Sequence, residues 1–143
     1  MTREEVGGLL ARTEPRAVVE LADDIVGALD SDAAVRITRP PQLGTVQVQV
    51  LEPLAGERFI LADALACNVE VLLDGQPGFA MRLGDDTVAV TAQAICEAEY
   101  AAGRGRAADV AALCRATAER LTVDRDAEWA ALRPTIVDFE EVR

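Results

Sequence analysis

The side chains best suited to acid–base chemistry in this sequence are carboxylates that lie close together. Glu20 and Asp24 are four residues apart, so they share one face of a helix, with Asp23 beside them. Two neighbouring carboxylates can divide the roles of acid and base when burial raises the pKa of one of them. Arg16, however, stands four residues before Glu20, and this spacing is typical of an ion pair on a solvated helix face. We therefore expect a structural role for this group.

A second acidic pair, Asp85 and Asp86, has the ligand type that magnesium prefers. The pair follows Gly84 and precedes an alanine-rich helical pattern. Acidic residues at such a position accept hydrogen bonds from the first backbone N–H groups of a helix. We predict that the pair caps this helix, and we assign no catalytic, cofactor-binding or metal-binding residue to the chain.

Three cysteines, Cys67, Cys96 and Cys114, are the remaining candidates for chemistry. Their number is odd and none of them forms a CxxC pair, so neither a disulfide framework nor a zinc ribbon is indicated. Cys96 and Cys114 lie among small apolar residues, where a free cysteine usually serves as a buried hydrophobic side chain. A nucleophilic cysteine would need its activating base from a partner, since the chain has no histidine.

The charge composition excludes several common kinds of site. The 143 residues carry a formal net charge of −11, all 14 basic residues are arginines, and lysine and histidine are absent. A Walker phosphate loop, a pyridoxal-phosphate Schiff base, an HExxH zinc site and a Ser-His-Asp triad therefore cannot be built from this chain. General nucleic-acid binding is disfavoured as well, because an acidic chain gains nothing from displacing phosphate counterions.

The sequence also bears on location. The longest stretch without a charged residue, Pro40–Leu51, has 12 residues, fewer than a membrane-spanning helix needs. The first residues contain no apolar segment typical of a secretion signal. We expect a cytoplasmic protein that does not enter a membrane.

The elements that must position these side chains change in type along the chain. A capping box at Thr2 and Glu5 begins a short helix, and Pro15 suits the first turn of a second helix. Helical patterns return after residue 86, with a break at Gly103–Gly105 and a separate piece at Asp126–Leu132. The order helices, strands, helices predicts one α+β domain over residues 1–143.

The middle of the chain, about residues 34–83, predicts an antiparallel meander sheet of four or five strands, flanked by the N-terminal and C-terminal helices. Turns are expected at Pro40–Gly44, Ala55–Glu57 and Asp74–Gly75. Between the first two turns, Thr45–Leu51 alternates valine with polar residues, which is typical of a half-buried strand. We expect Val46, Val48 and Val50 to face the core, so that Val48→Asp would unfold the domain.

An ordered set of short motifs extends from residue 36 to the last residue. The set comprises Arg36, Arg39-Pro40-Pro41, Gly44, Val46-Gln47, Gln49, Gly56-Glu57-Arg58-Phe59, Asp63, Leu73-Asp74-Gly75, Gly78, Gly84-Asp85-Asp86, Thr135, Val137-Asp138-Phe139 and Val142-Arg143. Together these motifs resemble PhnG, the G subunit of the bacterial carbon–phosphorus lyase system, over about residues 30–143. One departure is Glu140, which stands where a second aromatic residue is expected after Phe139.

The resemblance implies a support subunit that works with the H, I and J subunits in a core complex. With the I, H and L proteins, such a subunit supports attack of a phosphonate on the ribose C1′ of ATP, which releases adenine and forms α-D-ribose 1-methylphosphonate 5-triphosphate. The complex uses ATP and magnesium, while an iron–sulfur cluster and S-adenosylmethionine belong to another subunit. No cofactor is implied on this chain, and the family carries no assigned catalytic residue onto it.

Apolar groups beside a turn and in the tail indicate where a partner binds. Phe59 and Arg58 follow the turn at Ala55–Glu57, and Phe139 follows Asp138. Aromatic residues and arginine are common interface anchors, so we predict that Arg58, Phe59, Asp138 and Phe139 lie at or near a contact with another subunit, above all the I subunit. The alternative for the tail is packing against the chain's own sheet. Two other functions stay open here, a stand-alone acidic binding module and a small carboxylate-based enzyme.

Overall fold

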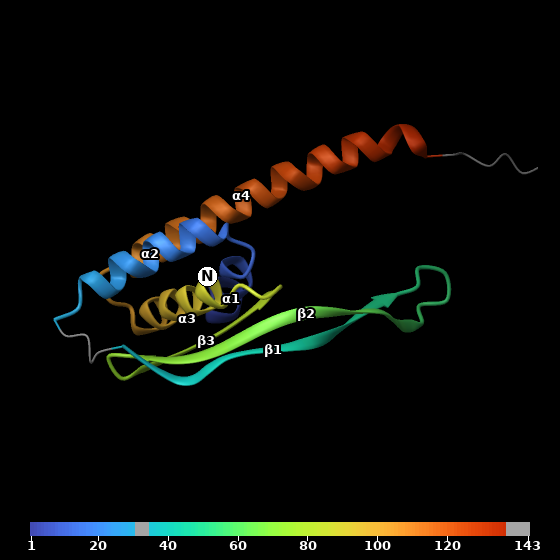
Figure 1. Cartoon of the computed structure of the whole chain (residues 1–143). Helices are drawn as coiled ribbons and strands as arrows, with labels where there is room; N and C mark the ends of the chain where they lie inside the picture. Colours follow the sequence, from blue (N-terminus) through green and yellow to red (C-terminus); the bar gives the residue numbers. More distant parts are fainter. Residues whose placement is uncertain (31–34, 137–143) are drawn as a thin grey trace, which may run out of the picture.

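The computed structural model describes residues 1–30 and 35–136 and confirms the α+β class. Two helices precede an antiparallel sheet and two follow it, and the helices lie on one side of the sheet (Figure 1). The elements are α1 (Arg3–Leu10), α2 (Pro15–Gly27), β1 (Val35–Leu51), β2 (Arg58–Leu73), β3 (Gln76–Leu83), α3 (Thr87–Ala102), α4 (Ala107–Leu132) and the 3-10 turn η2 (Arg133–Thr135). No helix in the two described ranges is long and apolar enough to cross a membrane.

The described sheet has three strands in the order β1-β2-β3, of which β1 and β2 are long, so the expected number of four or five is wrong. The expected turn at Pro40–Gly44 is also wrong, because β1 runs through it as one strand of 17 residues. An edge strand tolerates proline, and β1 absorbs the two prolines as register shifts between Ile37 and Gln42. β2 is likewise one continuous strand of 16 residues, which lowers the number of strands further.

Two helix starts follow the local sequence signals. The Thr2 hydroxyl accepts a hydrogen bond from the Glu5 N–H at 3.2 Å, and the Glu5 carboxylate accepts one from the Thr2 N–H at 2.7 Å. The Asp86 carboxylate accepts hydrogen bonds from Val88 N–H at 3.1 Å and Ala89 N–H at 2.8 Å. The capping box of α1 and the capping role of Asp86 at α3 are therefore confirmed.

The turns and the last helix show where local signals suffice and where they mislead. Asp74 and Gly75 have φ angles of 45° and 81°, which confirms the predicted turn, since a two-residue hairpin loop favours left-handed residues. Gly103 ends α3 with φ 64°. The expectation of a separate helical piece at Asp126–Leu132 is wrong, because α4 is one helix of 26 residues. Its sequence contains neither proline nor glycine, so nothing interrupts it.

The core is built around α3, which packs against β2 and β3 on one side and against α1, α2 and α4 on the others. Almost every α3 residue from Ala89 to Glu99 is buried. The sheet supplies alternate residues of β2 to this core: Cys67, Val69, Val71 and Leu73. The helix is rich in alanine, so its backbone lies close to all of its neighbours.

The predicted core position of Val46, Val48 and Val50 is wrong. The three side chains are half-buried and the polar residues between them are exposed, so the alternation itself is real. They lie in the part of the β1–β2 hairpin that extends beyond β3, whose ladder with β2 ends at Ala66. The three valines therefore belong to a two-stranded extension and not to the buried cluster around α3.

A buried arginine on β3, which the sequence did not single out, holds the first two helices against the sheet. Arg82 donates hydrogen bonds to the carbonyl oxygens of Leu10 at 2.7 Å and Thr13 at 2.6 Å. The Leu10 carbonyl lies at the C-terminal end of α1, where the helix dipole favours a positive charge, and the Thr13 carbonyl lies in the loop that leads to α2. Burial lowers the pKa of the Arg82 guanidinium, but an arginine stays charged in proteins.

The closest approach of sheet and helix occurs at Gly78 on β3. A methyl group built at Gly78 would lie 2.2 Å from the Ala94 carbonyl oxygen and 2.9 Å from the Ala98 Cβ. Neither neighbour can turn aside, because one is backbone and the other is the only side-chain carbon of alanine. A glycine is therefore required here by space and not by its φ angle.

We predict that Gly78→Ala lowers the free energy of unfolding by about 3 kcal/mol, since α3 must move away from β3. Gly44→Ala on β1 is the matched control, because a methyl group there meets nothing within 4 Å. It should change stability by less than about 0.5 kcal/mol. Urea denaturation of both variants measures the difference, and equal midpoints would contradict the packing described here.

A second pair of variants tests the position of the valines. Val71→Asp places an unpaired carboxylate in the core against α3 and should cost at least about 4 kcal/mol, enough to unfold the chain. Val48→Asp lies on the two-stranded extension and should cost only about 1 kcal/mol. Thermal melting by circular dichroism distinguishes them, and loss of the cooperative transition in Val48→Asp would restore the core position that the alternation first suggested.

Candidate partner interface

The most unusual feature of the structure is a two-stranded extension of the sheet, which we call the hairpin arm (residues 44–65). From Thr45 to Leu51, β1 pairs with β2 residues 58–65, which lie beyond the last β2–β3 pair at Ala66. Figure 1 shows the arm reaching past the end of α3, with no described helix against it. Its large exposed apolar side chains are Leu51, Leu54, Phe59, Ile60, Leu61 and Leu65. An apolar surface of this kind marks a contact site in a soluble protein.

The far end of the arm is well ordered by local hydrogen bonds. The N–H groups of Glu52 and Gly56 donate to the carbonyls of Glu57 and Glu52 at 2.8 Å and 3.0 Å, so the predicted turn around Gly56 is confirmed. The predicted interface residues Arg58 and Phe59 lie directly after this turn, opposite Leu51 and Val50, and both are exposed. Asp138 and Phe139 lie outside the described residues, so their predicted role stays a prediction.

The face of the sheet away from the helices carries a second apolar surface. Along β3, buried Gly78, Ala80 and Arg82 alternate with exposed Phe79, Met81 and Leu83. The exposed set points away from α3, and Figure 1 shows no described element on that side. Within residues 1–30 and 35–136, the helices thus cover one face of the sheet.

The second half of α4 also leaves the body of the domain. The buried residues of α4, Val110, Cys114 and Thr117, all lie in its first half. The later part exposes Val123, Trp129 and Leu132, and in Figure 1 it extends past the same end of α3 as the arm. Trp129 and Leu132 are three residues apart and so share one helix face.

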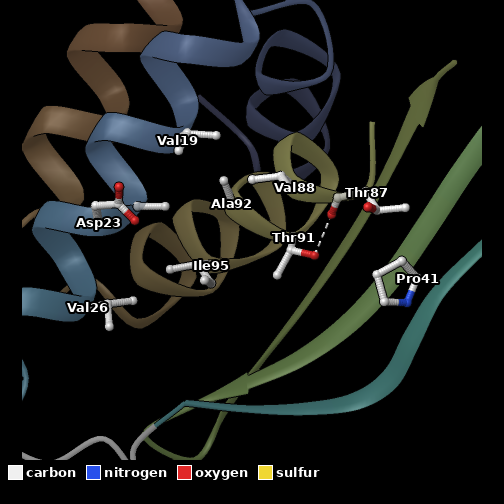
Figure 2. Close-up of a pocket in the computed structure, with 10 residues that line it drawn as sticks. Val19, Asp23, Val26, Pro41, Thr87, Val88, Thr91, Ala92 and Ile95 are labelled. Atoms are coloured by element: carbon white, nitrogen blue, oxygen red, sulfur yellow. Dashed lines mark hydrogen bonds between the residues drawn. The ribbon is translucent and has the colours of Figure 1, made fainter. Parts of the chain in front are cut away.

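A pocket of about 340 Å³ lies between α2, α3 and β1 (Figure 2). Its lining is mostly apolar and includes Val19, Val26, Pro41 and Ile95. Asp23 is the one ionisable group among the ten lining residues, and the Thr91 hydroxyl is occupied by donating to the Thr87 carbonyl at 2.7 Å. An acidic, apolar pocket suits an apolar group and not a phosphate.

Three of the carboxylates that the sequence raised as candidates are engaged in ion pairs or in a helix cap. Glu20 pairs with Arg16 at 2.8 Å on an exposed helix face, as the spacing predicts. Asp24 pairs with Arg106 at 2.5 Å, and Asp86 caps α3. Across the part of the chain that the structure describes, no group of three or more His, Cys, Asp or Glu side chains is arranged to hold a metal.

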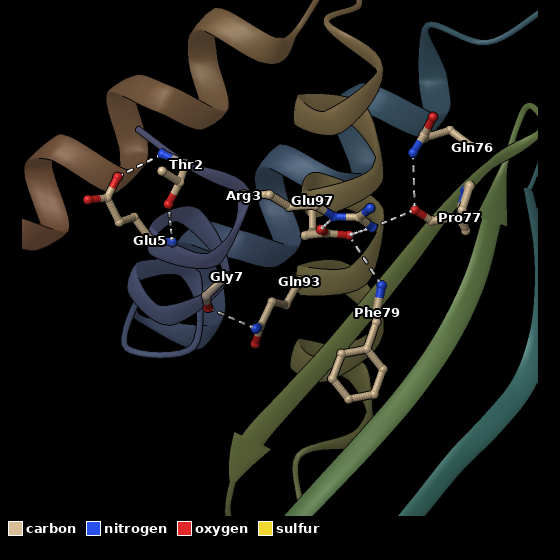
Figure 3. A network of polar contacts seen from close by, with 9 residues as sticks. All are labelled: Thr2, Arg3, Glu5, Gly7, Gln76, Pro77, Phe79, Gln93 and Glu97. Carbon is tan, nitrogen blue, oxygen red and sulfur yellow. Dashed lines mark hydrogen bonds and ion pairs between the residues drawn. The ribbon is translucent and has the colours of Figure 1, made fainter.

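Two buried acids that sequence reasoning missed, Glu97 and Glu99, are each paired with an arginine. Figure 3 shows the Glu97 carboxylate in an ion pair with Arg3 and accepting a hydrogen bond from the Phe79 N–H at 3.2 Å. The pairing raises the pKa of Arg3, which also donates to the Pro77 carbonyl at 2.9 Å. This network fastens α1 to α3 and β3. It therefore has a structural role.

The second acid, Glu99, holds the turn between α3 and α4. Its carboxylate accepts a hydrogen bond from the Arg106 N–H at 3.0 Å and lies 3.3 Å from Arg104 Nε. Arg104 also pairs with Asp74 at 2.8 Å, which ties this turn to the β2–β3 hairpin. Arg104, in the predicted break at Gly103–Gly105, is thus a structural link.

The cysteines are buried, as the sequence predicts for Cys96 and Cys114. All three thiols are free and buried. Burial raises the pKa of Cys96 to about 12 and that of Cys114 to about 11, and it also raises the pKa of Cys67. A thiol that stays protonated is a poor nucleophile.

Comparison with known proteins identifies a family for the whole chain. The family model described as phosphonate metabolism protein PhnG matches residues 1–143. The search of curated proteins gives no significant match.

Proposed function

The chain belongs to the PhnG family of phosphonate metabolism proteins, and we propose that it is a non-catalytic assembly subunit of the carbon–phosphorus lyase core complex. The family gives the chain a role in phosphonate metabolism. The finer role is our proposal, with the H, I and J subunits as partners and the L protein joining in the transfer step.

The observation that carries this proposal is the hairpin arm. A domain of this size can bury its apolar side chains in one core, yet the arm holds six large apolar side chains in solvent. Exposed apolar surface is costly to keep in water, and subunits of permanent complexes commonly have such surfaces covered by a partner. The groups that could do chemistry do not favour a catalytic role, since the buried acids are paired with arginines and the thiols are buried.

In this proposal the chain completes or rigidifies the site of the I subunit. There an oxygen of the phosphonate attacks C1′ of the ribose of ATP, the bond from C1′ to adenine breaks, and adenine leaves. Holding the two reactants in a near-attack geometry accelerates such a step without any catalytic group from this chain. ATP, magnesium, the iron–sulfur cluster and S-adenosylmethionine are assigned to other subunits of the complex.

We predict that Phe59→Ala weakens binding to the I subunit by about thirtyfold, because a buried aromatic anchor contributes about 2 kcal/mol. Phe79→Ala is the matched control. Phe79 is 50% exposed against 47% for Phe59, but it lies on the open sheet face. Pull-down from co-expressing cells followed by titration measures both. A loss confined to Phe79→Ala would place the contact on the sheet face and contradict the assignment of Phe59.

We also predict that the purified chain forms no product from ATP and methylphosphonate, and that the I, H and L proteins need it for full turnover. Product analysis with and without this chain measures the requirement. Turnover by the chain alone, abolished by Asp24→Asn or Asp85→Asn, would support a carboxylate-based enzyme instead. A chain that recovers no protein of the phosphonate system would support the stand-alone binding module.

A further inference from the structure

The outer edge of β1 is the longest unpaired backbone surface in the described sheet. Among the described strands, β1 pairs with β2 alone, so one side of its 17 residues offers N–H and C=O groups to solvent. Such an edge is a template for another strand, since only a second backbone can satisfy the whole row of groups at once.

The part of this edge in the hairpin arm lacks the features that normally prevent pairing. Thr45–Leu51 contains no charged residue and no proline, and it alternates valine with polar side chains. Its register with β2 is regular from Gln42 to Val48, and the irregularity that follows places the extra residue, Leu61, on β2. The opposite edge, β3, is only eight residues long and contains Pro77. The long uncharged edge is thus left open where natural edge strands are usually blocked.

The surroundings of this edge favour a partner subunit over a second copy of the chain. Edge-to-edge pairing of two copies would lengthen the sheet but leave the apolar side chains on its faces, such as Phe59 and Leu65, in water. Two chains of net charge −11 also repel one another. Around the edge the arm carries three acids, Glu52, Glu57 and Asp63, and one arginine. These charges match an apolar strand flanked by lysine or arginine.

We propose that a strand of a basic partner subunit adds to the outer edge of β1 along Thr45–Leu51, with its flanking basic side chains beside the three acids. The inference rests on the proposed function, because the partner is a subunit of the same complex. It specifies backbone pairing, which docking of side chains on the arm alone would not require.

Hydrogen exchange of the full chain, free and in the co-purified complex with the H, I and J subunits, tests this pairing. The amides of Thr45–Leu51 that face outward, away from β2, should exchange at least about tenfold more slowly in the complex. Protection already present in the free chain would show that another part of the chain or a second copy occupies the edge. That result, or an absence of protection in a complex that forms, would overturn the proposal.

A proline pair separates backbone pairing from side-chain contact. Adjacent residues of a strand direct their N–H groups to opposite edges, so one of Val46→Pro and Gln47→Pro removes an outward N–H and the other breaks the ladder with β2. The proline variant that loses the outward N–H group should melt at the same temperature as the wild type but bind the partner at least about tenfold more weakly. Alanine at the same position keeps the N–H and should bind normally.

The outcomes distinguish this inference from the function on which it rests. A folded proline variant that binds as tightly as the wild type overturns the edge pairing, while assembly of the complex itself still stands. If the wild-type chain recovers no subunit, the proposed function and the edge pairing fall together. If both proline variants fail to fold, the hydrogen-exchange measurement alone decides whether the edge is paired.

Discussion

The close packing of α3 against β3 at Gly78 is the contact on which the rest of the fold depends. Because six of the 16 residues of α3 are alanine, the helix fills little space by itself, and its buried positions require neighbours on every side. The sheet comes within van der Waals distance only because Gly78 has no side chain. Helices α1, α2 and α4 then complete the enclosure, and the ion pair of Arg3 with Glu97 and the hydrogen bonds of Arg82 fix α1 in place.

This arrangement sets the size of the core, and two elements are longer than the core can cover. The β1–β2 hairpin continues beyond the last pair of β3, and α4 continues beyond Thr117, its last buried residue. Both extensions keep apolar residues such as Phe59 and Trp129 in solvent. Surface that adds nothing to folding alone is most simply explained as surface that is covered on assembly.

The sequence predicted those features that depend on neighbouring residues. The capping box, the cap at Asp86 and the turn at Asp74–Gly75 each involve groups within three residues, so local patterns identify them. Prediction from the sequence failed where contacts between residues far apart in the chain determine the structure. Proline normally indicates a turn, but β1 continues through Pro40 and Pro41 because it is an edge strand, a fact of topology.

In the candidate interface, too, the features that depend on neighbouring residues were predicted and those that depend on tertiary contacts were not. Arg58 and Phe59 were chosen because they follow a turn, and the structure places them exposed on the arm. The outer edge of β1 was not singled out, since its exposure depends on where the core ends. Glu97 was missed because its partner Arg3 is 94 residues away.

The chemistry available to this chain follows from these contacts. An acid can serve as a general base only if its proton affinity is raised and it can reach a substrate, whereas Glu97 and Glu99 are held by arginines inside the domain. The thiols are buried in their neutral form. The described surface therefore offers a partner mainly its shape, the apolar area of the arm and a net negative charge, with exposed arginines such as Arg58 among the acids. These properties can position another subunit, which is the role that we propose for this chain.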